Sequence, residues 1–399
     1  MVTTVRDGTV AEANDLNLPA DLSVAGKVVL PGLVNGHDHL RSLLPFTRRS
    51  DTSALADLIE AGRLAGTAAT AEDYRALTAL ASARQVLSGI VSAVDHVYPL
   101  HDEAMLRAVA EGHAEAGLRG QIAYGVSSAI DLDRAAAAAD DVVPAERLYL
   151  APVSLRQTSV ADYRASVAAA ERTGLRLYTH IAETLDEVER CQAEHGLRPI
   201  ELLHGIGFLR PGTVLVHCVQ VNDREIELLA ENSVSVVYCP SNHLKLAKGF
   251  APVLAMRDAG VRVCLGIDGM TDLFTEMRQA VYAQGSAAGR PGALTTESAW
   301  RMGTTDGSAA IGDNDPGLIT VAADDVRLAP LVDPVQALVH RGSGPQVRDV
   351  LVDGELVVRD GALVKADLAE LTERAWKATR GIAERTGKEV PADWNWQQN

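Results

Sequence analysis

The stretch PGLVNGHDH, residues 31–39, joins a strand-like apolar run to two histidines spaced two residues apart. Alternate side chains of a β-strand point to the same face, so His37 and His39 would direct both imidazoles to one side. Two imidazoles so placed can clamp a metal ion, although an HxH pair alone is weak evidence because such pairs often have a structural role. The stretch therefore predicts a strand whose C-terminal end has two side chains that could bind a metal ion.

Seven further strand-like runs follow, and Ala-rich amphipathic segments separate them. The eight predicted strands are 28–34, 90–95, 121–126, 148–153, 175–180, 213–217, 234–239 and 261–268, and the predicted helices include 71–87, 103–116, 161–172, 223–230 and 296–310. Alternating strands and helices are typical of parallel βα units, and eight of them predict a (β/α)8 barrel of the TIM type. Such barrels carry their catalytic groups at the C-terminal ends of the strands.

The two ends of the chain have a different pattern. Residues 1–29 and 317–366 contain short alternating strands, with Asp-Gly pairs at 353–354 and 360–361 that are typical of hairpin turns. We expect these segments to form one small β domain and residues 30–316 to form the barrel. A helix at 368–386 and a Trp-containing tail would complete residues 367–399.

The composition excludes several classes of function. The chain has 399 residues, of which 47% are hydrophobic, as in ordinary globular proteins, and a formal net charge of -16. Binding to nucleic acid or to an anionic membrane needs clustered Lys and Arg, so neither partner is expected. No apolar run approaches the roughly 18 to 20 residues of a membrane span, and the first residues lack a signal-peptide pattern. These features predict a cytoplasmic protein that acts on a small molecule.

Further polar residues follow other predicted strands. His180 and Glu183 occur in HIAET after the fifth strand, His217 ends the sixth, and Asp268 ends the eighth. Because parallel strands present their C-terminal ends at one rim, these side chains should gather there. Imidazole nitrogens and a carboxylate are suitable ligands for Zn(II) or Fe(II), so the pattern predicts a metal site at this rim. The four cysteines show no CxxC spacing and are expected to be buried, reduced thiols.

The segments PGLVNGHDH, GIVSAVDH, HIAET, VLVHC, CPSNHLKL and LGIDG, in this order, resemble the amidohydrolase superfamily. Within it they are similar to the aminohydrolase branch, which includes the adenosine-derivative, guanine and cytosine deaminases and the s-triazine hydrolases. The segments TESAWRMGTTDGSAAIG and VRDVLVDGELVVRDG extend the resemblance, which covers about residues 24 to 366. It implies a hydrolase that acts on non-peptide C–N bonds, and it favours a homodimer or a larger homo-oligomer.

The resemblance also implies roles for individual residues. The residues that match the metal ligands are His37, His39, His180 and Asp268. Glu183 and His217 match the residues that move protons and orient the water. Asp268 has a second catalytic role in this scheme, because it would accept the proton of the metal-activated water.

The resemblance implies one divalent ion per chain, with Zn(II) as the first expectation and Fe(II) as the alternative. Binuclear members of the superfamily bridge two ions with a carboxylated lysine on the fourth strand. This chain has no lysine between Lys27 and Lys245. A mononuclear site is therefore expected.

Five other residues near the predicted rim are candidates for substrate binding: His96, Arg156, Gln157, Asn242 and His243. The stretch APVSLRQTS after the fourth strand lacks the histidine that many purine-type deaminases have there. Its Arg156 and Gln157 could instead bind a carboxylate or a ring carbonyl. The alternatives stay open: a structural hydrogen bond for His96, and a brace of its own loop for Asn242.

A basic first loop contains Arg41, Arg48 and Arg49. It is either a solvated loop or a lid that recognises an anion.

The leading prediction is hydrolytic deamination of a nitrogen heterocycle. A second prediction is hydrolysis of an amide, urea-type or carbon–halide bond, because the same activated water can attack any electrophilic carbon. A metal-assisted lyase and a non-catalytic metal-binding barrel are the remaining alternatives. The complete set of ligands, together with Glu183 and His217, argues against the non-catalytic barrel.

Overall fold

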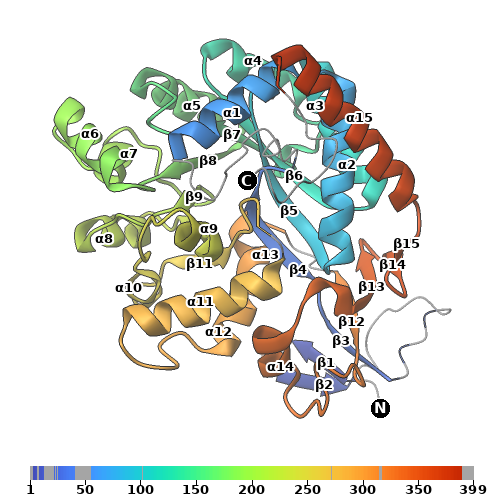
Figure 1. Cartoon of the computed structure of the whole chain (residues 1–399). Helices are drawn as coiled ribbons and strands as arrows, with labels where there is room; N and C mark the ends of the chain where they lie inside the picture. The colour runs from blue at the N-terminus through green and yellow to red at the C-terminus, as the bar shows by residue number, and fades with distance from the viewer. Residues whose placement is uncertain are drawn as a thin grey trace, which may run out of the picture.

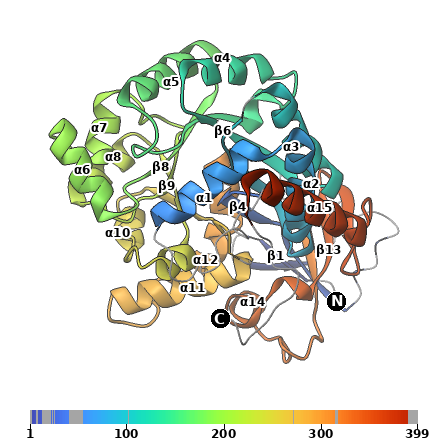
Figure 2. The same cartoon turned by 45° about the horizontal axis from the view of Figure 1, so that its top comes forward.

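The computed structural model describes residues 3–6, 9–12, 22, 24, 26–40, 55–100, 102–270, 272–313 and 317–388. Eight parallel strands in sequential order curl into a nearly closed barrel surrounded by helices (Figures 1 and 2). They are β4 (Leu33–Asp38), β5 (Ile90–Val97), β6 (Arg119–Val126), β7 (Leu148–Pro152), β8 (Arg176–Ile181), β9 (Val214–His217), β10 (Ser235–Tyr238) and β11 (Arg262–Leu265). The predicted barrel is confirmed.

Most helices of the barrel lie between successive strands. They are α1 (Leu55–Ala68), α2 (Ala71–Leu87), α3 (Glu103–Ala116), α4 (Ala129–Ala138), α5 (Val160–Thr173), α6 (Leu185–His195), α7 (Pro199–Gly205), α8 (Asp223–Glu231), α9 (Pro240–Lys245), α10 (Val253–Asp258), α11 (Leu273–Ala287), α12 (Thr296–Met302) and α13 (Thr305–Ile311). Helices α2 and α3 have the predicted bounds because Thr70 and Asp102 cap their first turns and Gly117, with a left-handed φ, ends α3.

One helix prediction was wrong. The segment 296–310 was expected to be a single helix, but it forms α12 and α13 with a break at Gly303 and Thr304. The carbonyl of Gly303 accepts a hydrogen bond from the backbone N–H of Val34 in β4, 2.9 Å away. This carbonyl is therefore used to attach the helices to the first barrel strand instead of continuing α12.

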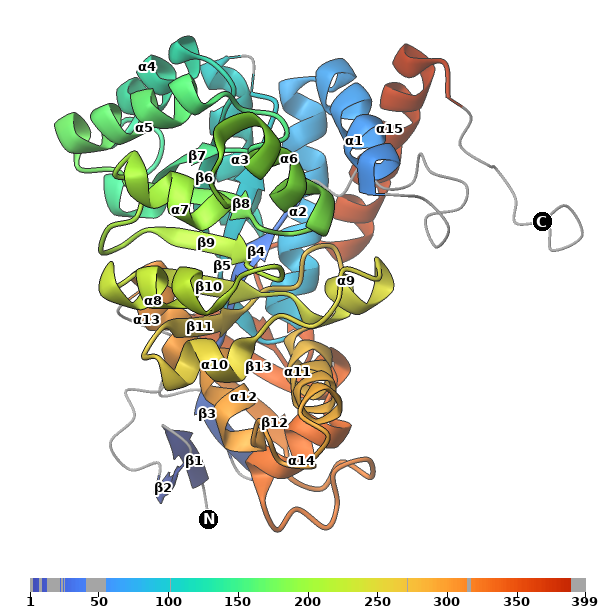
Figure 3. The ribbon, with the colours of Figure 1, turned by 90° about the vertical axis from the view of Figure 1, so that its left-hand side faces the viewer.

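Segments from both chain ends form a second sheet of order β15-β14-β13-β12-β3-β1-β2, at the bottom of Figure 3. Its strands are β1 (Thr3–Arg6), β2 (Thr9–Glu12), β3 (Lys27–Pro31), β12 (Leu318–Ala322), β13 (Val347–Val352), β14 (Glu355–Arg359) and β15 (Ala362–Leu363). Asp353-Gly354 and Asp360-Gly361 have positive φ at both positions, as tight hairpin turns require. The predicted small β unit is confirmed, whereas its exact domain bounds stay a prediction. Helix α14 (Pro334–Arg341) precedes β13, and α15 (Leu368–Thr386) has the predicted bounds.

The predicted strand 28–34 was also wrong in its extent, because it is divided between the two sheets. Strand β3 pairs with β12, and β4 begins after Gly32 as the first barrel strand. The N–H of Gly32 donates to the carbonyl of Gly317, and the N–H of Leu33 donates to that of Gly89. A continuous apolar run does not reveal such a change of partner.

The barrel closes between β4 and the segment after β11 through one buried side chain. The Oδ1 atom of Asn35 accepts hydrogen bonds from the backbone N–H of His37 at 3.2 Å and of Ile267 at 3.0 Å. The carbonyl of His37 accepts from the N–H groups of Ile267 and Asp268, both at 3.1 Å. This seam brings two proposed metal ligands together although His37 and Asp268 are 231 positions apart in the sequence.

We expect Gly36→Ala to destabilise the protein by about 1–3 kcal/mol, because a Cβ at this seam would overpack the barrel interior. It would lie 2.8 Å from the Sγ of Cys264 and 3.1 Å from the carbonyl oxygen of Leu265. Gly205→Ala is the control, since its Cβ would meet nothing within 4 Å and its stability should change by less than about 1 kcal/mol. The free energy of unfolding in urea measures both, and equal stability of the two variants would contradict the steric explanation.

No helix in the described part of the chain is long and apolar enough to cross a membrane. All four cysteines are free and buried, as predicted.

Candidate metal and catalytic site

Three imidazoles at the rim of the barrel are each oriented through their Nδ1 atom. The Nδ1 of His37 lies 2.8 Å from the hydroxyl of Tyr178, that of His39 lies 2.8 Å from the carbonyl of His96, and that of His180 lies 2.7 Å from the carbonyl of Val153. Such contacts fix the tautomer and the ring orientation of metal-binding histidines. All three Nε2 atoms are therefore available as ligands.

The Nε2 atoms converge on the carboxylate of Asp268. The Nε2 atoms of His37 and His180 are 3.2 Å apart, and the Oδ1 of Asp268 lies 3.4 Å from the Nε2 of His37 and 3.9 Å from that of His39. The ligand atoms of His37, His39 and Asp268 all lie within 4.8 Å of one another. This spacing leaves room for one ion between them.

The electrostatics of the cluster also fit a cation. Burial, with the neighbouring His37 and His39, lowers the pKa of His180 to about 3. Burial raises the pKa of Asp268, but its contact with His37 outweighs this and holds that pKa well below its usual range. A neutral imidazole and an ionised carboxylate are the forms that bind metal, so the donor set suits a divalent ion.

His96 belongs to the same cluster of rings. Its imidazole is buried and stacks on that of His180, with ring centroids 4.6 Å apart. Its ring nitrogen lies with those of His37 and His180 in a second group that could hold a metal. The predicted substrate-binding role of His96 stays a prediction, and the structure places the side chain against the proposed ligands.

The backbone is strained where the strands reach the site. Ala182, His217 and Asp268 have φ values of 50°, 80° and 47°, in the left-handed region that residues other than glycine rarely adopt. These residues end or follow β8, β9 and β11. Strain of this kind costs of order 1–3 kcal/mol per residue and is concentrated at functional sites, where it directs side chains that regular strands would point elsewhere.

Glu183 lies beside the ligands in a clamp of three basic side chains. Its Oε1 is 2.5 Å from the Nζ of Lys248 and 3.3 Å from the Nε2 of His217, and its Oε2 pairs with Arg156. Burial alone would raise the pKa of this carboxyl, but the charges of Lys248 and Arg156 lower the pKa to about 2. Glu183 is therefore ionised near neutral pH.

Sequence reasoning missed Lys248. Its buried ammonium also donates a hydrogen bond to the side chain of Asn242, whose Nδ2 donates to the carbonyl of Asp268 at 3.1 Å. These contacts fit the alternative of a brace for this loop, and because Asn242 also lines the pocket, its substrate-binding role stays a prediction. No signal in the sequence distinguishes Lys248 from the exposed Lys245, because the turn after α9 decides which of them points inward.

Arg156 and Gln157 have different surroundings. The guanidinium of Arg156 contacts Glu183 and lies 2.9 Å from the Oε2 of Glu187. It is thus paired with two carboxylates of its own chain, and because Arg156 also lines the pocket, its predicted contact with a substrate stays a prediction. Gln157 is exposed, and its Oε1 accepts a hydrogen bond from the Ser154 hydroxyl at 3.4 Å.

His243 lies behind His217. The Nε2 of His243 is 3.0 Å from the Nδ1 of His217, and the ring is buried. It is not among the described residues that line the pocket in front of the site. The predicted contact with substrate therefore has no support from this placement.

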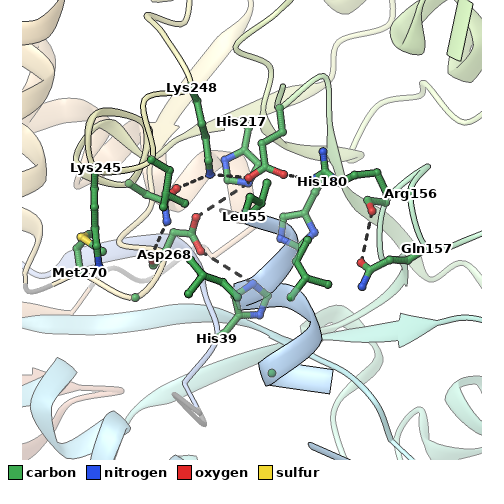
Figure 4. Close-up of a pocket in the computed structure, with 18 of the residues that line it drawn as sticks. His39, Leu55, Arg156, Gln157, His180, His217, Lys245, Lys248, Asp268 and Met270 are labelled. Atoms are coloured by element: carbon green, nitrogen blue, oxygen red, sulfur yellow. Dashed lines mark hydrogen bonds and ion pairs between the residues drawn. The ribbon is translucent and has the colours of Figure 1, made fainter. Parts of the chain in front are cut away.

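A pocket of about 160 Å³ lies at the C-terminal rim, and Arg156 and Glu183 are among its lining residues. Figure 4 shows His39, His180, His217 and Asp268 pointing into it. Leu55, Leu58 and Ile59 of α1 form an apolar wall, so one side of the pocket is suited to a flat apolar ring. Arg41, Arg48 and Arg49 of the predicted lid lie outside the described residues.

The sequence model of the Amidohydrolase family matches residues 28–357. The chain belongs to this family. This confirms the resemblance, and with it the prediction of a hydrolase for C–N bonds other than peptide bonds. Members of the family depend on a metal, which agrees with the His and Asp groups at the rim.

Individual relatives support this classification of the amidohydrolase. A 5-methylthioadenosine/S-adenosylhomocysteine deaminase from Halobacterium salinarum is 34% identical over 397 residues, covering 92% of this chain and 90% of the relative. A 5'-deoxyadenosine deaminase from Methanothermobacter thermautotrophicus is 31% identical over 415 residues, covering 96% and 94%.

Solved structures show the same fold. An adenosine deaminase from Xanthomonas campestris with bound zinc superposes with a TM-score of 0.82 at 24% identity, covering 90% of this amidohydrolase and 87% of that chain. An atrazine chlorohydrolase from Arthrobacter aurescens, complexed with zinc, has a TM-score of 0.82 at 22% identity, covering 90% and 92%.

Proposed function

We propose that this amidohydrolase catalyses the hydrolytic deamination of an amino-substituted nitrogen heterocycle, with adenosine derivatives as the first candidates. The observation that carries the proposal is the position of Glu183 and His217 beside the converging ligand atoms, at the bottom of one pocket. The names of the two sequence relatives support the choice of adenosine derivatives.

His37, His39, His180 and Asp268 would hold one divalent ion, with Zn(II) as the first candidate. When bound, such an ion lowers the pKa of a water molecule to about 7 and polarises the reacting carbon's substituents. The zinc in two structural neighbours is compatible with this choice. The predicted homo-oligomer and cytoplasmic location stay predictions.

The protein groups then move protons between water, Glu183 and the substrate. In the net reaction, water and the amino-heterocycle give the hydroxy- or oxo-heterocycle and ammonia. Glu183, which is ionised at rest, takes one proton from the water and delivers it to the ring nitrogen as the C–O bond forms, and Asp268 accepts the other proton of the water. His217 stabilises the oxygen that adds to the carbon. The proton held by Asp268 then passes through Glu183 to the amino group before the C–N bond breaks, so that ammonia leaves.

The cationic clamp explains why Glu183 is suited to this task. Lys248 and Arg156 disfavour its neutral form, so a proton that it accepts is passed on readily to a basic ring nitrogen. The same clamp restricts the carboxylate to one position between His217 and the pocket. Arg156 and Lys248 therefore act through Glu183 and are positioning residues.

A screen for released ammonia tests the proposal. The protein, loaded with zinc, is incubated with 5'-deoxyadenosine, 5-methylthioadenosine, S-adenosylhomocysteine and a panel of other amino-heterocycles. Turnover of at least one of these, with solvent oxygen from labelled water in the product, is the expected result. No ammonia from any of them, together with turnover of an amide or halide panel, would replace deamination by the alternative hydrolysis.

We expect Lys248→Met to lower kcat about a hundredfold, because the Glu183 carboxylate loses its Nζ partner and its fixed position. Metal content should stay that of the wild type, since Lys248 contacts none of the proposed ligands' metal-facing atoms. Lys377→Met, at an exposed site on α15, is the control and should be fully active. Metal analysis and steady-state kinetics measure these effects, and a normal kcat for Lys248→Met would refute the clamp.

A further inference from the structure

We propose that His243 is a positioning residue that holds His217 in a single tautomer, with the hydrogen on Nε2. The role of the Nε2 hydrogen in catalysis rests on the proposed function, whereas the tautomer follows from the geometry of the free protein. His217 and His243 are both buried, and contacts on each side of the two rings fix their orientation.

The Nε2 of His217 lies 3.3 Å from the Oε1 of Glu183 and 4.0 Å from the Oδ2 of Asp268. Both neighbours are carboxylate oxygens, which only accept hydrogen bonds when ionised. A bare lone pair at this position would face two anions, so Nε2 carries the hydrogen and donates it.

His217 is a buried imidazole, and a ring that has lost its contact with water favours the neutral form, which has one hydrogen in total. With that hydrogen on Nε2, the Nδ1 atom is an acceptor. Its partner at 3.0 Å, the Nε2 of His243, must therefore be the donor.

The ring of His243 is buried as well. Burial and the charge of Lys248 lower the pKa of His243 to about 3, so this ring is neutral too. Its Nδ1 has no hydrogen-bond partner among the described residues. With the hydrogen on Nε2, the atom left without a partner is an acceptor, and an unpaired buried acceptor is tolerated better than an unpaired N–H. Both rings therefore favour the same arrangement.

The ring of His243 is itself held in place. It packs against the ring of Tyr238 with centroids 5.4 Å apart, and its backbone carbonyl accepts from the N–H of Lys248 at 2.9 Å. The turn that places Lys248 on Glu183 thus also places His243 on His217. His243 and Lys248, which belong to one segment, therefore contact the two catalytic side chains His217 and Glu183.

With this tautomer fixed, the Nε2 of His217 always donates a hydrogen bond at the site. His217 can present an N–H to the oxygen that adds to the substrate carbon, and it cannot act as a base from the same atom. Loss of the His243 donor would let the hydrogen of His217 occupy Nδ1 in part of the molecules. Those molecules would lack the donor that the reaction needs.

The test compares His243→Leu, which removes the donor, with His243→Gln, whose side-chain amide can donate from a similar position. The tautomers are read by ¹⁵N NMR of protein labelled in the histidine rings, with the zinc-loaded protein. We expect a hydrogen on Nε2 and none on Nδ1 of His217 in the wild type and in His243→Gln, and a mixture in His243→Leu. A hydrogen on Nδ1 of His217 in the wild type overturns the proposal.

The kinetic part separates positioning from stability. His243→Leu should lower kcat by about ten- to a hundredfold, with KM and metal content near normal, and His243→Gln should restore most of kcat. His195→Leu, on the exposed end of α6, is the control. An unchanged kcat for His243→Leu, or equal losses for Leu and Gln, contradicts the proposal. If no amino-heterocycle is turned over, the proposed function fails, and the NMR result still decides the tautomer.

Discussion

Glu183→Gln is expected to lower turnover at least about a thousandfold while the metal content stays near that of the wild type. The amide can fill the space between Arg156, Lys248 and His217, but it cannot accept and return a proton. Deamination requires that transfer twice, once for the ring nitrogen and once for the leaving ammonia. Metal analysis and kcat on an amino-substituted substrate measure the two effects separately.

A second substrate provides the control for Glu183→Gln. A related heterocycle with chloride as its leaving group needs no proton for departure, so its hydrolysis should fall much less. The melting temperature should also be recorded, because the variant leaves the cations of Lys248 and Arg156 with one buried anion fewer. Near-normal turnover of the amino substrate, or an empty metal site, would contradict the role given to Glu183.

His180→Ala is expected to remove the metal and the activity together. The Nε2 of His180 lies 3.2 Å from that of His37, so it is central to the cluster, and its Nδ1 is already committed to Val153. Alanine removes one of four proposed ligands and leaves a cavity at the end of β8. Elemental analysis should give about one ion per wild-type chain and almost none for the variant.

A buried histidine away from the ligands is the matched control for His180→Ala. His113 is buried on α3, where its Nε2 contacts Asp95 at 3.2 Å, so His113→Gln tests the cost of changing a buried histidine without changing a ligand. It should keep its metal even if it is less stable. Two ions per wild-type chain, or full activity after exhaustive chelation, would contradict the mononuclear site.

Much of this architecture could be predicted from local patterns in the chain. The alternation of apolar runs with amphipathic segments predicted the barrel, because buried side chains recur along a strand or a helix with a fixed period. The starts of α2 and α3 also depend on local contacts, since Thr70 and Asp102 accept hydrogen bonds from backbone groups three residues further on. Residues that end parallel strands share a rim, so His180, His217 and Asp268 could be brought together in the prediction without coordinates.

The remaining features depend on contacts between segments that lie far apart in the sequence. Whether residues 28–34 form one strand depended on the partners of each half, because both halves are equally apolar. The ion pair of Arg156 with Glu183 spans 27 positions, and the contact between His217 and His243 spans 26. No local pattern shows that Arg156 turns to a carboxylate of its own chain, or that Lys248 points inward while Lys245 stays exposed. A buried charge loses its hydrogen bonds to water and must form others with protein groups. Which protein groups lie within reach depends on how the whole barrel packs.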